Sequence, residues 1–207
     1  MNSERQSFLS QVDVSRETLE RLDTYAALLT KWNPAINLVA PSTLQHLWSR
    51  HFLDSAQVLG IAPDAKKWVD IGTGGGFPGL IVAILAAQTH PDLAVTCIES
   101  DLRKATFLRT VARETGVDVQ VISNRIEQVE PLHADVLSAR ALAPLNKLLG
   151  FAERHLSPDG RALFLKGASY ADEVKEALEN WRFQADTYAS KTDLNAVILT
   201  LGDISRV

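Results

Sequence analysis

The residues best suited to chemistry form a glycine-rich stretch, because five of the eight positions from 72 to 79 are glycine. A short apolar segment, Lys67–Gly72, precedes them, and a longer one, Leu80–Ala87, follows. A strand, turn and helix of this kind bring backbone close to a ligand, since glycine has no Cβ and adopts positive φ readily. The carboxyl ends of parallel strands are where such sheets bind ligands. We therefore predict a ligand-binding loop rather than a tight turn without a ligand.

The spacing within this loop points to a nucleotide-like cofactor. Gly74, Gly76 and Gly79 match the dinucleotide pattern G-x-G-x-x-G, and no Gly-Lys-Ser/Thr follows, which excludes a P-loop. Asp70, two residues before the first glycine, resembles the acidic-x-Gly-x-Gly opening of class I methyltransferases, which bind S-adenosylmethionine. Glu99 ends the next predicted strand, where it is placed to accept hydrogen bonds from ribose hydroxyls, although NAD sites use a similar acid. In the alternative interpretation, Asp70 caps a turn and Glu99 lies beside a helix N-cap.

The length and composition of the chain narrow the choice of cofactor and the class of protein further. A dehydrogenase usually adds a substrate domain, for which 207 residues leave little room, so S-adenosylmethionine is favoured over NAD. A net charge of −4 argues against non-specific coating of nucleic acid.

The one cysteine, Cys97, excludes a disulfide framework, and we expect it to be a buried residue of a strand. We also expect no metal site. The amino terminus has no secretory pattern and no apolar run is long enough to span a bilayer, so we expect a cytoplasmic protein without membrane contact.

Alternating strand and helix patterns must position these residues. Residues 1–60 predict only helices, with Ser15 as an N-cap, Asn33-Pro34 as a helix stop and a second helical stretch over 42–60, so we expect a helical cap there and an α/β domain over 61–207. In that domain the predicted strands are 67–72, 93–99, 117–123, 134–139, 161–166, 183–189 and 196–201, and the predicted helices are 80–87, 102–115, 144–156 and 170–180. This order predicts a doubly wound, mostly parallel sheet that ends in an antiparallel strand.

Several motifs spread along the chain carry a family resemblance. They are Trp32-Asn33-x-x-Ile36-Asn37-Leu38, Arg50-His51-Phe52-Leu53-Asp54-Ser55, the loop from Asp70 to Gly79, Arg125-Ile126-Glu127, Ser138-Ala139-Arg140-Ala141 and Leu165-Lys166-Gly167. Over nearly its whole length the chain resembles the bacterial GidB/RsmG family of 16S rRNA (guanine-N7) methyltransferases. The resemblance implies a Rossmann-like class I fold with a short N-terminal extension, S-adenosylmethionine as cofactor, and N7 of a guanosine in the 530 loop of 16S rRNA (position 527 in standard numbering) as the methyl acceptor.

The resemblance also implies a set of site residues. By matching positions, the cofactor pocket is lined by Gly72, Phe77, Ile126, Glu127 and Arg140. The loop and strand arguments above add Gly74 and Glu99.

The implied reaction needs no general base, because guanine N7 carries an in-plane lone pair and no proton. Catalysis then comes mostly from placing N7 in line with the departing sulfur. We therefore assign no catalytic residue, and the candidates for positioning the substrate are Arg50, His51, Arg140 and Lys166. Because methylated guanine is itself cationic, we expect Arg140 and Lys166 to bind phosphate, guanine O6 or the methionine carboxylate.

Charge is distributed unevenly along the chain. Segment 136–169 is net basic and segment 167–207 is net acidic. A predicted helix adds a basic stripe of Arg103, Lys104, Arg109 and Arg113. Basic side chains position phosphates, so we expect RNA to bind at one local site, with solvated charges as the alternative interpretation of the stripe. The expected partner is 16S rRNA within the 30S subunit or an assembly intermediate, and the expected state is a monomer.

Two other functions stay open. A small-molecule methyltransferase on the same fold would have a closed pocket without a basic rim. A non-catalytic nucleotide-binding module would prefer NAD to S-adenosylmethionine.

Overall fold

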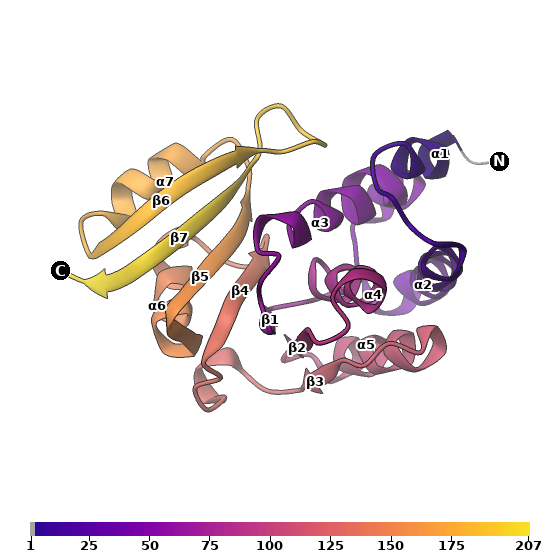
Figure 1. Cartoon of the computed structure of the whole chain (residues 1–207), viewed down its shortest axis with the longest axis horizontal. Coiled ribbons are helices and arrows are strands. Elements are labelled where there is room, and N and C mark those ends of the chain that lie inside the picture. Colours follow the sequence, from indigo (N-terminus) through magenta and orange to yellow (C-terminus); the bar gives the residue numbers. More distant parts are fainter. Residues whose placement is uncertain (1–2) are drawn as a thin grey trace.

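A seven-stranded sheet lies at the centre of the molecule, with the strand order β3-β2-β1-β4-β5-β7-β6 (Figure 1). The computed structural model describes residues 3–207, so Met1 and Asn2 of the polar amino terminus lie outside the described residues. The strands are β1 Lys67–Ile71, β2 Ala94–Ile98, β3 Gln120–Ile122, β4 Ala134–Arg140, β5 Leu156–Lys166, β6 Trp181–Ala189 and β7 Val197–Arg206. Strands β1 to β5 pair in parallel, and β7 runs antiparallel to both β5 and β6. The predicted sheet and its antiparallel end are confirmed.

Helices cover both faces of this sheet. They are α1 Ser3–Leu9, α2 Arg16–Ile36, α3 Asp54–Ala56, α4 Gly79–Thr89, α5 Leu102–Thr115, α6 Leu145–His155 and α7 Tyr170–Ala177. On one face, α4 and α5 pack together with the N-terminal helices around Trp68 and Phe107. On the other face, α6 and α7 pack around Val69 and Leu137. Because side chains alternate along a strand, neighbouring residues of β1 supply both cores.

Helix α4 is apolar all round because it is enclosed on all sides. All its residues from Gly79 to Ala86 are buried, and it contacts β1 and β2 as well as α2 and α3. The N-terminal residues Phe8, Leu22 and Tyr25 belong to the same core cluster as Ile81 of α4. The N-terminal cap and the sheet therefore share one hydrophobic core. The division of the chain into a cap (residues 1–60) and an α/β domain (residues 61–207) stays a prediction. No helix among residues 3–207 is long and apolar enough to cross a membrane.

The predicted stop at Asn33-Pro34 is wrong, because α2 continues through Pro34 to Ile36. Pro34 lies in the last turn, where its missing N–H leaves only the carbonyl of exposed Thr30 without an intrahelical partner. The helix ends instead at Asn37, which adopts φ 49° and donates its N–H to the carbonyl of Asn33. The predicted N-cap, Ser15, is confirmed: its hydroxyl accepts from the N–H of Thr18.

Further boundaries also differ from the predictions: β3 begins at residue 120 instead of 117, and β7 continues to residue 206 instead of 201. The second helical stretch of the cap is divided into a 3-10 helix (Pro41–His46), a π-helix (Trp48–Leu53), α3 and a further 3-10 turn (Leu59–Ile61). Strand β5 begins at Leu156, five residues before its predicted start at residue 161, with an irregular register opposite β4. The amphipathic helix 102–115 is confirmed without change.

Candidate functional site

Two adjoining pockets open at the carboxyl ends of the parallel strands. The smaller has a volume of about 480 Å³ and is lined by the glycine-rich loop after β1 and by residues that follow β2 and β3. The larger, about 1120 Å³, lies between the cap, the end of β5 and the β6–β7 hairpin. Both pockets share the side chains of His51 and Arg140 and the segment 141–143 after β4. A ligand in one pocket therefore lies next to a ligand in the other.

The glycine-rich loop has the backbone that only glycine adopts at low cost. Gly72 and Gly74 have φ values of 60° and 58°, and Gly76 has φ 106°. The Tyr25 hydroxyl of α2 donates to the carbonyl of Gly75 at 2.5 Å, so the cap fixes the loop from behind. The glycines therefore shape the loop, and a buried hydrogen bond from the cap helps to hold it.

All seven predicted cofactor residues line the smaller pocket: Gly72, Gly74, Phe77, Glu99, Ile126, Glu127 and Arg140. The four predicted substrate-positioning residues all line the larger one: Arg50, His51, Arg140 and Lys166. Of these residues, only Arg140 was predicted both to bind the cofactor and to position the substrate, and it lies where the two pockets meet.

Glu99 lies after β2, as predicted, but its carboxylate already accepts two backbone hydrogen bonds. Its Oε2 accepts from the N–H of Gly74 at 2.8 Å and its Oε1 from the N–H of Asp101 at 2.8 Å. These bonds hold the carboxylate at the pocket wall, and each oxygen retains a lone pair for a further donor.

Asp70 does not line either pocket and lies beneath the loop. Its Oδ1 accepts from Ser138 Oγ at 2.6 Å, and its Oδ2 accepts from the N–H of Gly79, the first residue of α4, at 3.1 Å. Complete burial raises the pKa of this carboxyl to about 6, although both hydrogen bonds act against the increase. Asp70 thus ties the start of α4 to β1 and β4, a role close to the turn cap that was the alternative interpretation.

Arg140 connects the end of β4 to the cap. Its guanidinium donates to Asp54 Oδ2 at 3.2 Å, to the carbonyl of Arg50 at 3.2 Å and to His51 Nδ1 at 2.8 Å. It also stacks over the ring of Phe77, 4.7 Å from the ring centroid. These contacts leave Arg140 with a partly neutralised charge and a fixed position between the pockets.

His51 is held as a neutral imidazole. Its Nδ1 accepts from Arg140, so its Nε2 carries the proton and donates to Thr43 Oγ1 at 2.8 Å. Burial and the neighbouring charges of Arg140 and Arg50 lower its pKa to about 3. Because its one lone pair is occupied by Arg140, His51 is poorly placed to act as a general base.

Sequence reasoning missed the residues that hold the site from a distance. Asp54 Oδ1 accepts from Thr192 at 3.0 Å, and Gln57 accepts from the N–H of Lys191. These bonds join the β6–β7 hairpin to α3 (both drawn in Figure 1), and residues of both elements line the larger pocket. His155 of α6 lies 3.1 Å from the carbonyl of Ile126 in the smaller pocket. The Arg-His-x-x-Asp-Ser motif contains Asp54 and was a usable indication of its role, whereas nothing local marks Thr192.

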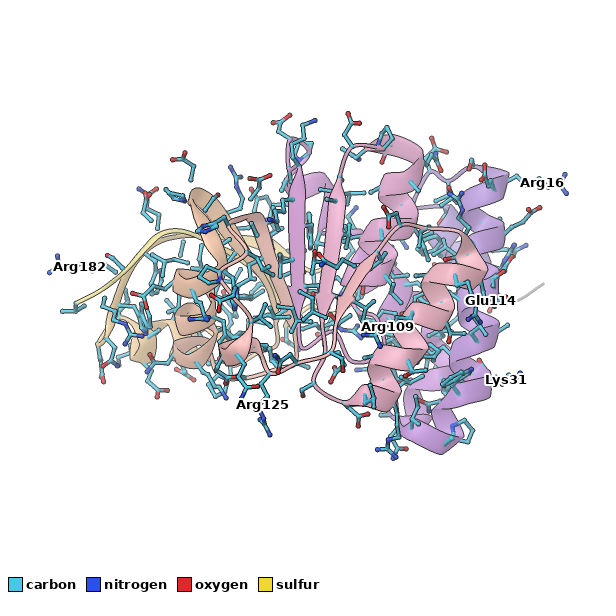
Figure 2. All side chains as sticks on the ribbon, turned by 90° about the horizontal axis from the view of Figure 1, so that it is seen from below. Arg16, Lys31, Arg109, Glu114, Arg125 and Arg182 are labelled. Carbon is cyan, nitrogen blue, oxygen red and sulfur yellow. The ribbon has the colours of Figure 1, made fainter. Side chains whose placement is uncertain are left out.

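The predicted basic stripe does not form one free surface. Arg109 donates to the carbonyl of Val121 in β3, Arg103 pairs with Asp101, and Arg113 pairs with Glu114. Of the four residues of the stripe, Lys104 lines the smaller of the two pockets described above. Arg125, at the same pocket, projects away from the body of the molecule, while Arg109 lies against the sheet (Figure 2).

The strand order, the glycine-rich loop and the acid after β2 define a class I, S-adenosylmethionine-dependent methyltransferase fold. The O-methyltransferase from Bacillus cereus in complex with SAH matches with a TM-score of 0.62 and 13% identity, covering 98% of both chains. The O-methyltransferase TomG from Streptomyces achromogenes in complex with SAM matches with a TM-score of 0.61 and 16% identity, covering 97% of this chain and 96% of that one. At such identities these likenesses show the fold alone.

The comparison with protein families and curated relatives is more specific than the shared fold. Residues 18–197 match GidB, described as rRNA small subunit methyltransferase G. The chain is 55% identical to the Ribosomal RNA small subunit methyltransferase G of Ruegeria sp. (strain TM1040), over 95% of this chain and 96% of that protein. It is 50% identical to the protein of the same name from Paramagnetospirillum magneticum (strain ATCC 700264 / AMB-1), over 97% and 96%. The chain belongs to the GidB family and is an S-adenosylmethionine-dependent methyltransferase.

Proposed function

We propose that this enzyme transfers a methyl group from S-adenosylmethionine to N7 of a guanosine in the 530 loop of 16S rRNA. The observation that carries the proposal is the pair of adjoining pockets, one lined by all the predicted cofactor residues and the other by all the predicted substrate-positioning residues. Family membership supports rRNA as the acceptor. The choice of N7 rests on the family resemblance and on the chemistry below.

The residues of the smaller pocket fit S-adenosylmethionine. Gly72 and Gly74 let the loop backbone face the pocket without a Cβ, which suits the methionine part. The Glu99 carboxylate is fixed where ribose hydroxyls would donate to it. The half-exposed carboxylate of Glu127 and the backbone of Ile126 suit the adenine amino group and ring. When bound, the cofactor supplies an electrophilic methyl group on a sulfonium.

The larger pocket fits a nucleophile that needs no deprotonation. Guanine N7 attacks with its own lone pair, so the protein has to position the base and exclude competing nucleophiles. His51 stays neutral with its lone pair occupied by Arg140, in agreement with a reaction that uses no general base. Arg140 shares its charge with Asp54, which lowers its repulsion of a base that becomes cationic on methylation.

Basic residues around the pockets suit an RNA partner. Arg50 at the larger pocket and Lys104, Arg125 and Lys147 at the smaller one are candidates for phosphate contacts. A structured RNA compensates for the chain's net negative charge, because it can engage one local basic rim rather than the whole surface. We therefore propose the 30S subunit or an assembly intermediate as partner, a monomeric enzyme, and a cytoplasmic location.

A methyl-transfer assay tests this function. The protein is incubated with tritiated-methyl S-adenosylmethionine and either 30S subunits or naked 16S rRNA, both from a strain lacking the gene. Label confined to one guanosine of the 530 loop, with 30S subunits from a methylated strain accepting none, is the expected result. Absence of label in 16S rRNA, while calorimetry shows that the cofactor binds, would contradict it and favour a small-molecule substrate. Preferential binding of NAD would favour a non-catalytic module.

A further inference from the structure

The segment 141–145, between β4 and α6, separates the two pockets. Ala141, Leu142 and Ala143 line both of them. The side chain of Leu142 lies directly against the α-carbon of Gly72, where a Cβ on that glycine would overlap it. Within the function proposed above, on which this inference rests, the methyl group and its acceptor must meet beside this segment. The position of segment 141–145 therefore decides whether the methyl group and its acceptor align.

This segment cannot hold its own conformation. Ala141 adopts φ 51°, a left-handed conformation that an L-residue with a Cβ keeps only when its surroundings impose it. Helix α6 begins after Pro144, which has no side-chain oxygen to cap the first N–H groups of the helix. Both features require a contribution from another part of the chain.

A partly buried ion pair, between Lys166 of β5 and Glu173 of α7, makes that contribution. Glu173 Oε2 accepts from the N–H of Leu145 at 2.7 Å, so α7 caps α6. Lys166 Nζ donates to the same Oε2 at 2.6 Å and to the carbonyl of Ala143 at 3.0 Å. The Lys166 side chain is only 9% exposed, which leaves little of it for RNA. The pair thus binds the segment on both sides of Pro144.

We propose that Lys166 and Glu173 are positioning residues that fix segment 141–145, and with it Leu142, at the junction of the cofactor and substrate pockets. This replaces the sequence-based expectation that Lys166 binds phosphate, guanine O6 or the methionine carboxylate directly. Lys166 lines the larger pocket, but two of its three ammonium protons are donated to Ala143 and Glu173, so we assign its charge to holding the segment rather than to binding a ligand.

Variants of the pair test the proposal with two independent measurements. In Lys166→Met and in Glu173→Ala, hydrogen exchange at the Leu145 amide should become about tenfold faster, since each loosens the same hydrogen-bonded unit. In a methylation assay on 30S subunits, kcat should fall about tenfold in each, because a small misplacement of reacting groups costs rate rather than affinity. The double variant should lose no more than the worse single variant.

Two further variants serve as controls. Lys166→Arg keeps a cation within reach of both acceptors and is expected to retain slow exchange and most of kcat, even if Lys166→Met lowers the melting temperature. Lys175→Met removes an exposed lysine from the same helix, α7, and should change neither measurement.

Contrary results have clear meanings. If Lys166→Met raises KM for 30S subunits and flattens its salt dependence while Glu173→Ala leaves kcat unchanged, Lys166 binds RNA directly and the proposal is wrong. If Leu145 exchange is unchanged in both variants, the pair does not hold the segment. Hydrogen exchange at the Leu145 amide needs no substrate. It therefore still shows whether the ion pair fixes the segment if the wild-type protein fails to methylate 16S rRNA.

Discussion

The loop after β1 and the segment after β4 meet at the wall between the pockets, but they are fixed by different means. In the first, residues 72–79, the conformation comes mainly from glycines at positive φ and from short-range bonds such as the N–H of Gly76 to the carbonyl of Thr73 at 2.9 Å. Tyr25 and Glu99 each add one hydrogen bond to this loop from elsewhere in the chain. In the second, residues 141–145, it comes from Lys166 and Glu173, which lie far away in the sequence, and Asp54 holds Arg140 at the end of β4 just before this segment. A loop that depends on glycine backbone should fail when a Cβ is added, and a segment without glycine that depends on distant side chains should fail when one of them is removed.

Adding a methyl group at Gly79 should have the largest effect on the first loop. A Cβ there would lie 2.7 Å from Cys97 Sγ and 2.8 Å from both Cβ and Oδ2 of Asp70, all buried. Gly79→Ala should therefore lower the free energy of unfolding by about 3 kcal/mol, the upper end for overpacking a core. Chemical denaturation measures this. Gly60→Ala is the control, since nothing lies within 4 Å of a Cβ at Gly60. Equal stability of the two variants would contradict the close backbone approach.

Removing Arg140 should have the largest effect on the second segment. Arg140→Ala deletes the contacts to Asp54, His51 and Phe77 together, so we expect turnover to fall about 100-fold, or about 2.7 kcal/mol of transition-state stabilisation. Asp54 keeps Thr192 and Gln57 as partners, so the loss of stability should be smaller. Single-turnover kinetics and thermal melts measure the two effects. If both losses are equal, Arg140 has only a structural role.

The same contrast explains which parts of the site were predictable. The glycine loop and helix 102–115 follow from local spacing, because their conformations depend largely on neighbours in the chain. The cofactor residues follow from that loop and from family motifs, although one of them, Arg140, is held by distant residues. Thr192 and Glu173 have no local signature, since their partners Asp54 and Leu145 lie far away in the sequence. Asp70 was marked by its spacing, but only the fold places it beneath the loop instead of in the pocket.

A larger side chain at Gly74 should affect ligand binding rather than folding. Apart from the carbonyl of Gly72 at 3.8 Å, nothing lies near a Cβ at this position, so a leucine would extend into the smaller pocket. Gly74→Leu should weaken S-adenosylmethionine binding about tenfold or more, about 1.4 kcal/mol. Gly116→Leu is a matched control, because Gly116 has φ 64° and open space but caps α5 outside the pockets. Both variants should lose about 1 kcal/mol of stability to backbone strain, and calorimetry should show weakened binding only for the first.

The smallest expected effect concerns Asp70, whose pKa of about 6 exceeds the usual value of 3.8. The folded protein therefore holds this proton more tightly than the unfolded chain does, and stability falls as the pH rises from about 4 towards 6. Between about pH 5 and pH 7 the free energy of unfolding should drop by about 1 kcal/mol more in the wild type than in Asp70→Asn. The asparagine faces the same donors, Ser138 Oγ and the N–H of Gly79, but does not titrate, so its cost is the same at both pH values. Denaturant unfolding at the two pH values measures the difference, and parallel pH profiles would show that burial does not raise this pKa.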